Sequence, residues 1–596
     1  MFIKVTTTRG RRYAQLVESF RNEAGQPRQR TLATLGRLEP DGDVDRLVQA
    51  LQRAQGREPA AERSVGAVAS DLKFLGARSA GDVWALWQVW CSLDLDGLSL
   101  AWRRSKSGVD VLACLRTMAF NRLCDPSSKL GVLRWLQTVA LPRGFGFEMA
   151  PPDHQHLLRA MDVLDEHADA INERLALLMR PLIDQELSVV FYDLTTVRVH
   201  GEAQVEGDVR QMGRSKDGGV ARQFVLSLVQ TADGLPIAHE VHPGSTAEAK
   251  TLLPMIDKLL ARWPLKRVVL VADRGLLSLN NLQEIEALQK KLRDDGRDVT
   301  LDYVLAVPAA RYGEFKDELQ QLDAQHDSTK PWVAEMTWER SSEAAQPPAQ
   351  PQRYRLVLAH DPEAAHRRTR ARREQIAELV ALGEQWGGRL DAQDGGQRRR
   401  GRPLSDSGAK ARLYHAVKEA GLAHLIKVDL HSELFQFTID EQRQQYLERL
   451  DGKLLLVTST TQPAAEVVDR YKSLPDIERG FRALKSDIEI GPVYHRLPKR
   501  IRAHALICFL ALILHRVLRM RLRDHQRAES PMRLLEQLAR IQQQTVHSAA
   551  DGQLLHGLTD MKPAQKELFA AIGAALPTPA QLHPPNLDQE VDSATV

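Results

Sequence analysis

The sequence predicts an α/β fold, in which a mixed sheet with flanking helices is interrupted by a β-rich insertion and preceded by a helical region and a small N-terminal β module. Three patterns predict this fold. Apolar and polar residues alternate within 1–56, apolar residues recur with a helical period through 82–186, and strand-like segments alternate with helix-like ones from 187 onward. With 596 residues, 43% hydrophobic and 27% charged, the chain is long enough for several folded domains.

The first 56 residues are expected to form a small β-rich module. Their alternation surrounds Gly10 and a turn at 22–25, which favours two or three short strands before a helical stretch near 43–55. Arginines mark the turns of this module: Arg9, Arg11, Arg12, Arg28 and Arg30. These arginines could contact an anionic polymer, or they could simply cover a solvated hairpin surface, and the sequence favours neither explanation. Residues 57–69 have the composition of a linker.

Residues 70–186 are expected to be helical. Three tryptophans, Trp84, Trp87 and Trp90, follow one another at helical spacing, which is typical of side chains in a core. The four cysteines show no paired spacing and are expected to be thiols in a reducing compartment.

The segment 187–308 is expected to form the first part of a central α/β core. Strand-like runs at 187–193, 222–230 and 236–241 precede a helix at 246–263, a strand at 267–273, a helix at 278–292 and a strand at 302–307. In this reading Asp193 ends the first strand and Asp273 ends the fourth. The ends of buried strands hold carboxylates rigidly while leaving them open to solvent and ligand.

Three further regions complete the predicted organisation. Residues 309–450 are expected to form a β-rich insertion domain with Arg-rich loops at 366–373 and 398–402, which suit either phosphate neutralisation or solvated loops. Residues 451–545 return to the core with C-terminal helices, and 546–596 form a helix and a Pro-rich tail that is disordered from 576. The longest apolar run, 505–514, is shorter than the roughly 18 to 20 residues that span a bilayer, so a buried helix is expected. The N-terminus has no apolar signal core, which argues against secretion.

Two carboxylates at strand ends of one sheet suggest a divalent-cation site. Mg²⁺ prefers oxygen ligands, and two such ions activate the attacking oxygen and stabilise the leaving oxygen in phosphoryl transfer. A third acid is expected on a helix that starts near Leu474, with Ser473 as its N-cap and Pro475 in its first turn. Glu478 and Lys485 are seven residues apart on this helix, so two turns bring them to one face. The alternative explanation is that Glu478 and Lys485 are ordinary surface residues of an amphipathic helix.

These residues resemble a known family, the bacterial insertion-sequence transposases with a ribonuclease H-like DDE core, in the group marked by a Tyr-x2-Arg-x3-Glu-x6-Lys signature. Tyr471, Glu478 and Lys485 match this spacing, and Leu474 stands where the signature has Arg. The family resemblance extends to FYDLTT, VVLVADRGLLS, the segment 213–256 and the N-terminal GQPRQRTLATLGRL. It covers nearly the whole chain, with three motifs in the right order.

The resemblance implies a DNA transposase. Asp193, Asp273 and Glu478 are then the catalytic residues and the ligands of two Mg²⁺ ions, which Mn²⁺ can replace, while Tyr471 and Lys485 contact DNA. The helical region 70–186 is expected to bind DNA. The expected partners are double-stranded DNA, as terminal inverted repeats and target, and a second copy of the chain in a synaptic homodimer. The expected location is the cytoplasm, at the nucleoid when the protein acts, with no membrane partner.

Three functions remain to be compared. The first is hydrolysis at the element end followed by attack of the freed 3′-hydroxyl on target DNA. The second is a catalytically inactive, transposase-derived DNA-binding protein. An active site that is no longer needed is expected to lose a carboxylate, so the presence of all three acids argues against this function. The third is a ribonuclease H-like nuclease without strand transfer, which needs neither the insertion nor the N-terminal module.

Overall fold

The computed structural model describes the chain in segments that form two units. The units are residues 1–76 with 544–557 and residues 77–543 with 558–596. The described residues are 2–8, 11–21, 27–38, 72–105, 108–147, 151–183, 188–202, 207–216, 218–247, 250–263, 265–272, 279–340, 352–396, 404–473, 475–548 and 552–583.

The N-terminal module is an antiparallel three-stranded sheet, as the alternating pattern predicts. Its strands are β1 (Phe2–Thr8), β2 (Arg11–Arg21) and β3 (Pro27–Leu38). Register shifts in the β2–β3 pair at Ala14/Gln15 and Leu16/Val17 mark irregular points in the ladder. The helical stretch expected at 43–55 and the linker at 57–69 lie outside the described residues.

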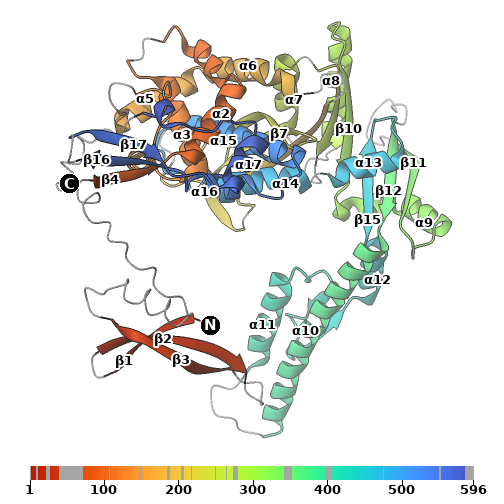
Figure 1. Ribbon diagram of the computed structural model, residues 1–596. Helices are drawn as coiled ribbons and strands as arrows, with labels where there is room; N and C mark the ends of the chain where they lie inside the picture. Colours follow the sequence, from red (N-terminus) through yellow and green to blue (C-terminus); the bar gives the residue numbers. More distant parts are fainter. Residues whose placement is uncertain are drawn as a thin grey trace. The chain divides into compact units, whose positions relative to one another are not determined.

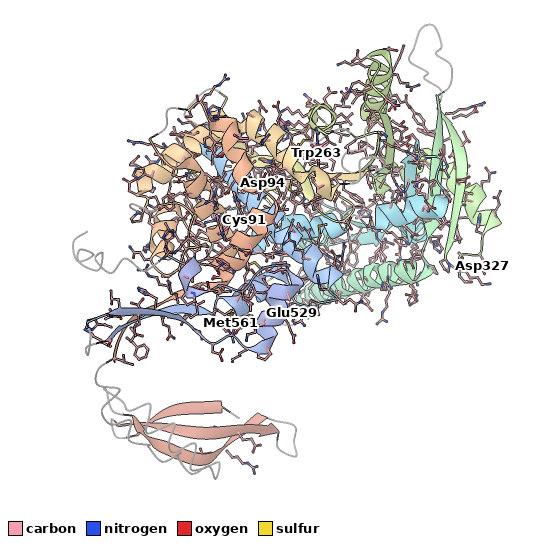
Figure 2. The ribbon with its side chains drawn as sticks, turned by 45° about the horizontal axis from the view of Figure 1, so that its top comes forward. Cys91, Asp94, Trp263, Asp327, Glu529 and Met561 are labelled. Atoms are coloured by element: carbon pink, nitrogen blue, oxygen red, sulfur yellow. The ribbon has the colours of Figure 1, made fainter. Side chains whose placement is uncertain are left out.

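The region 70–186 is helical except at its start, where residues 72–79 form strand β4. This strand pairs in the order β17–β16–β4 with two C-terminal strands, which is a contact that local periodicity cannot predict. The elements are β4 (Leu72–Ser79), α2 (Gly81–Ser92), η2 (Leu95–Trp102), α3 (Val111–Cys124), α4 (Lys129–Leu136), α5 (His154–Glu166), α6 (Ala168–Met179) and η3 (Arg180–Leu182). Trp84 and Trp90 are buried and Trp87 packs against the same core, as predicted. All four cysteines are free, and Cys91 lies exposed at the end of α2 (Figure 2).

A large mixed sheet forms the centre of the second unit (Figure 1). Its strand order is β11–β12–β15–β10–β9–β5–β7–β6, with β8 also paired to β7. The pairs β5–β9 and β9–β10 are parallel and the others are antiparallel. Its elements up to residue 306 are β5 (Ser188–Arg198), β6 (Gln211–Arg214), β7 (Val220–Thr231), β8 (Pro236–Pro243), α7 (Leu252–Arg262), β9 (Arg267–Ala272), α8 (Leu279–Asp294) and β10 (Thr300–Ala306).

This part confirms the predicted order of strands and helices, with one strand added. Strand β6 is a short piece that the sequence pattern did not reveal. The mixed sheet with flanking helices matches the predicted fold class, which resembles the ribonuclease H-like core.

Two hydrophobic clusters cover the opposite faces of this sheet. Tyr192, Leu194 and Leu270 belong to the larger cluster, which continues into the helical region. Phe191 and Val271 belong to a smaller cluster on the other face. The alternation follows from the two-residue period of a strand, so neighbours in sequence face opposite sides of the sheet.

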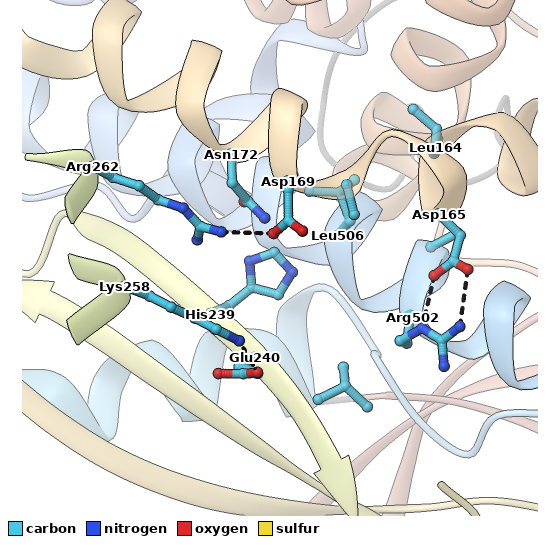
Figure 3. Close-up of a pocket in the computed structure, with 13 residues that line it drawn as sticks. Leu164, Asp165, Asp169, Asn172, His239, Glu240, Lys258, Arg262, Arg502 and Leu506 are labelled. Atoms are coloured by element: carbon cyan, nitrogen blue, oxygen red, sulfur yellow. Dashed lines mark hydrogen bonds and ion pairs between the residues drawn. The ribbon is translucent and has the colours of Figure 1, made fainter. Parts of the chain in front are cut away.

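Ion pairs join α5 and α6 of the helical region to Arg262 of α7 and to Arg502 around a cavity of about 280 Å³ (Figure 3). Arg262 of α7 bonds Asp169 of α6 at 2.8 Å, and Arg502 bonds Asp165 of α5 at 2.8 Å. His239 stacks on Phe509 with ring centroids 4.2 Å apart, and burial lowers the pKa of His239 to about 3. Lys258 pairs with Glu240 in the same cavity, so its charged lining residues balance. The cavity therefore lies at the junction between the helical region and the elements that flank the sheet, and its ion pairs hold the two together.

The insertion 309–450 is mostly helical, so the expectation of a β-rich domain was wrong. Strands β11 and β12 extend the central sheet through β15, and α10 leads away from that edge with α11 beside it (Figure 1). The elements are η6 (Ala309–Phe315), α9 (Lys316–Gln325), β11 (Trp332–Arg340), β12 (Gln352–His360), α10 (Pro362–Asp394), α11 (Asp406–Glu419), β13 (Ile426–Val428), β14 (Phe437–Ile439) and α12 (Glu441–Leu450). Helices α10 and α11 and the strands β13 and β14 enclose a core of their own.

The arginines at 366–373 lie on α10 and not in a loop. Ala, Arg, Glu and Gln favour a helix there, and Asp361 caps its start by accepting a hydrogen bond from the backbone N–H of Ala364 at 3.0 Å. Arg372 bonds Asp451 at 2.7 Å and Arg373 bonds Glu448 at 2.6 Å. These arginines therefore fasten α10 to the end of α12. The second Arg-rich segment, 398–402, lies outside the described residues.

The C-terminal part contains more regular structure than its composition predicts. Helix α15 is long and apolar enough to cross a membrane by length and composition, but its apolar window is 94% buried, as in a core helix. The elements are β15 (Lys453–Thr458), α13 (Ala464–Lys472), α14 (Pro475–Arg482), η7 (Ala483–Asp487), α15 (Pro498–Asp524), α16 (Pro531–Leu538), β16 (Gln542–Ser548), β17 (Leu554–Leu558), α17 (Pro563–Ala571) and η8 (Pro579–Gln581). The expected C-terminal helix is α17. The tail predicted to be disordered is ordered to residue 583, where Leu582 is buried and bridges to Pro142; residues 584–596 lie outside the described residues.

Candidate functional site

Asp193 lies in the middle of β5 and not at its end, which corrects the expectation from sequence. The strand continues to Arg198 because β7 pairs with it along its whole second half. What ends near Asp193 is the pairing with β9, whose last matched pair is Tyr192 with Ala272. Beyond this pair, the described residues give β5 a paired strand on the β7 side alone, so Asp193 stands where the described part of the sheet opens.

The strand β9 ends at Ala272, immediately before Asp273. Phe191 and Val271 are paired and belong to the same hydrophobic cluster, so Asp193, two residues after Phe191, is on that face of the sheet. Asp273 itself falls in the segment 273–278, outside the described residues. The parallel strands β5, β9 and β10 direct their carboxyl ends to one edge of the sheet, which is where ligands bind in open α/β sheets.

The carboxylate of Asp193 is partly exposed and lies beside a lysine. Its Oδ1 accepts a hydrogen bond from the backbone N–H of Leu194 at 2.7 Å and lies 3.6 Å from Lys216 Nζ. Lys216 also donates to the carbonyl of Leu194 at 2.6 Å. Lys216 was not among the residues predicted for the site, although it stands in the Gly-rich turn GRSKDGG between two strands, where a side chain can reach back over the sheet.

The donor chemistry at Asp193 fits a hard divalent cation. A carboxylate offers about four lone-pair positions, and Mg²⁺ selects oxygen ligands. Among the described residues, no group of three His, Cys, Asp or Glu side chains forms a metal cluster. Asp273 and the side chain of Glu478 are not among those residues, so the three-carboxylate set remains a prediction.

Glu478 lies on α14, a short helix that packs against β5. Helix α14 begins at Pro475, one residue after the expected start, and follows a separate helix, α13, that the sequence analysis missed. Ser473 closes α13, where its hydroxyl donates to the carbonyl of Arg470 at 2.6 Å. Leu474 lies outside the described residues. The helix carrying Glu478 and the strand carrying Asp193 are therefore neighbours.

Lys485 does not lie on a continuation of the same α-helix. Residues Ala483–Asp487 form a π-helical turn, closed by a bond from Ile488 N–H to the carbonyl of Ala483 at 2.8 Å. This wider turn changes the angle per residue, so the two-turn argument for Glu478 and Lys485 does not hold. Phe481 and Leu484 are buried on the inner side of this segment.

Close packing fixes the position of α14. A Cβ atom built on Gly480 would lie 2.4 Å from Nε2 and 2.8 Å from Oε1 of Gln230 on β7. Gln230 is fully buried, and its amide makes no hydrogen bond with the described residues. A side chain at position 480 would press on the buried amide of Gln230, so glycine suits this close approach.

Tyr471 and Lys485 belong to different surroundings. Tyr471 is partly buried at the end of α13, where it packs against the cluster that contains Phe191. Lys485 lines an open groove of about 620 Å³ together with Arg198 and Arg222. The groove follows the second half of β5, beyond Asp193, and three cationic side chains give it the chemistry of a phosphate-binding surface.

Two family models match the chain. Residues 3–63 match the IS1634 family transposase N-terminal domain. Residues 184–514, more than half of the chain, match the transposase DDE domain, whose members act on DNA and normally use divalent metal ions. No curated protein matches the chain. The chain therefore belongs to the bacterial insertion-sequence DDE transposases and functions in DNA transposition.

Proposed function

We propose that this transposase cuts DNA at insertion-sequence ends and joins the freed 3′-hydroxyl to target DNA at one site formed by Asp193, Asp273 and Glu478. The observation that carries the proposal is the register of β5 and β9, in which Tyr192 pairs with Ala272. Asp193 and Asp273 each directly follow one member of this pair in the chain, and neighbouring strands lie about 4.8 Å apart, which supports their joining in one site. Carboxylate side chains span such a gap when they hold two ions.

The third carboxylate is proposed to come from α14. This helix packs against β5, and the tight contact between Gly480 and Gln230 supports a fixed position for Glu478, two residues earlier. The ions, two Mg²⁺ or two Mn²⁺, activate the attacking oxygen and stabilise the leaving one when bound. Lys216, 3.6 Å from Asp193, and Lys485 in the groove supply cations for DNA phosphates. Tyr471, partly buried at the end of α13, is proposed to contact DNA as well.

The proposed partners and location follow from this chemistry. The substrates are the terminal inverted repeats and target DNA, and the N-terminal module and the helical region 70–186 are proposed to bind them. A homodimer is proposed because two ends must be held together for joining. We place the protein in the cytoplasm, where its DNA lies.

The test is a product assay with purified protein and plasmid DNA carrying the inverted repeats that flank the coding region. Wild-type protein is expected to yield both cut ends and joined strands with Mg²⁺ or Mn²⁺, and neither with EDTA. Cut ends without joined strands would identify a nuclease that lacks strand transfer. Bound DNA with neither product, at any protein concentration and with either metal, would identify a binding protein and contradict the proposal.

Gly480→Ala is expected to reduce cleavage about tenfold to a hundredfold, because the added Cβ displaces α14 and a shift near 1 Å costs about that much. The added Cβ presses on the amide end of Gln230, which is fully buried. Gly388→Ala on α10 is the control, since its Cβ meets nothing within 4 Å. The double variant Gly480→Ala/Gln230→Ser is expected to recover activity by making room. Wild-type initial rates for Gly480→Ala would show that this contact does not position α14.

A further inference from the structure

The groove beyond Asp193 carries a uniform positive charge. Arg198, Arg222 and Lys485 line it, and none of its lining side chains among the described residues is acidic. A groove of about 620 Å³ with three cations and no acid favours a polyanion that lies along β5. Arg198 is five residues after Asp193, or roughly 17 Å along the strand, so the groove begins within a few nucleotides of the proposed cut.

A pair of stacked aromatic rings stands at the far end of this groove. The rings of His200 and Tyr494 are 4.5 Å apart and inclined by 4°, so they lie face to face. Tyr494 is 68% exposed, which leaves its ring accessible to a further planar group. A tyrosine ring gains stability when it is buried, because it is large and mostly apolar. An exposed tyrosine ring that is supported on one face by His200 and lies near cationic side chains therefore suits the stacking of a nucleic-acid base on its other face.

Hydrogen bonds hold the ring pair rigidly. Val493 N–H donates to the carbonyl of Arg198 at 3.0 Å, and His200 N–H donates to the carbonyl of Val493 at 2.8 Å. These two bonds join the loop before α15 to the end of β5. Because both rings are attached next to these bonds, little conformational freedom is lost when a ligand stacks on them.

Buried side chains fix the same loop from beneath. Arg122 of α3 donates to the carbonyl of Glu489 at 3.2 Å, and His504 of α15 lies 2.9 Å from the carbonyl of Ile490. Burial lowers the pKa of His504 well below its usual value. The loop is thus a built element of the groove.

We propose that this groove binds an unpaired stretch of DNA strand next to the cut, with Arg198, Arg222 and Lys485 on its phosphates and one base stacked on Tyr494. The inference rests on the proposed function only in taking DNA as the ligand. A paired duplex hides the faces of its bases, whereas an unpaired strand offers them for stacking, and stacking accepts any base. The ring pair is therefore a site for strand separation at the element end.

The experiment measures binding of fluorescein-labelled oligothymidylate of 12 nucleotides and of a 12-base-pair duplex by anisotropy, in EDTA. Tyr494→Ala is expected to weaken binding of the single strand roughly five- to 150-fold and to leave the duplex within twofold, because one stacking contact is lost. Tyr494→Phe keeps the ring and is expected to bind like wild type. Tyr414→Ala on α11, 40% exposed, is the matched control.

A salt series separates stacking from charge. Arg198→Gln and Arg222→Gln are each expected to reduce the slope of log K against log salt by about 0.7 for the single strand, whereas Tyr494→Ala lowers affinity at unchanged slope. Equal losses for single strand and duplex in Tyr494→Ala, or no loss for either, would overturn the proposal. Thermal unfolding of each variant identifies a folding defect, and Tyr494→Phe keeps the test decisive.

The two proposals fail separately. Binding in EDTA involves no cleavage, so a Tyr494 result is independent of the three carboxylates. Cleavage-deficient protein with normal Tyr494-dependent binding would contradict the proposed chemistry alone. Active protein whose single-strand binding ignores Tyr494 would contradict the stacking site alone.

Discussion

Asp193→Asn, Asp273→Asn and Glu478→Gln are each expected to lower the rate of cleavage at element ends by about a thousandfold or more. Each substitution keeps the size of the side chain and removes a charge that holds a divalent ion. Metal ions contribute several kcal/mol of charge stabilisation in phosphoryl transfer, and each 1.36 kcal/mol is a factor of ten in rate. Single-turnover cleavage of plasmid carrying the inverted repeats, in Mg²⁺, measures the effect.

The comparison needs a control for folding and one for charge. Anisotropy in EDTA is expected to show DNA binding by all three variants within a few-fold of wild type, because phosphate contacts come from cationic groups. Asp257→Asn replaces an exposed aspartate on α7 and is expected to cleave normally. A wild-type cleavage rate in any one of the three variants would remove that residue from the site.

Asp208→Ala is expected to lower the free energy of unfolding of the core by about 3–5 kcal/mol, since it leaves the guanidinium of Arg210 buried without its counter-ion. Both side chains are 2% exposed. Arg210 donates to Asp208 from Nη2 at 2.6 Å and from Nε at 3.0 Å, and its backbone N–H donates to the same carboxylate at 2.9 Å. The pair precedes β6 and secures the segment that leads to it.

Urea unfolding followed by fluorescence measures this effect, taken at the transition of the second unit. Glu339→Ala is the matched control, because its pair with Arg353 is more than half exposed on both sides and its loss is expected to change stability little. The double variant Asp208→Ala/Arg210→Met removes both charges and is expected to recover most of the loss. Equal midpoints for Asp208→Ala and Glu339→Ala would show that burial of the pair carries no special cost.

Local patterns predicted the elements whose causes are local. The apolar runs before Asp193 and Asp273 identified β5 and β9, and the helical period identified most of the region 82–186. The end of β5 was misplaced because the polar residues after Asp193 break the apolar run, while their backbone still pairs with β7. A change of polarity along a strand marks a change of surroundings and does not end the strand.

The features that were not predicted depend on contacts between residues that are far apart in the sequence. Strands β11 and β12 look like parts of a separate domain until β15, which follows much later in the chain, pairs with β12 on one side and with β10 of the central sheet on the other. The arginines at 366–373 were predicted to lie in a loop because their acidic partners, Glu448 and Asp451, are distant in the sequence and come close only in the folded chain. The π-helical turn that contains Lys485 and the approach of Lys216 to Asp193 depend in the same way on folded neighbours.

The most direct test of the account is a crystal of the protein grown with Mn²⁺ and measured at the manganese absorption edge. Two anomalous peaks about 3.5–4 Å apart are expected, each within bonding distance of oxygens from Asp193, Asp273 or Glu478, with all three carboxylates used. Protein that cleaves DNA in Mn²⁺ but whose manganese peaks lie away from any one of these carboxylates would contradict the account.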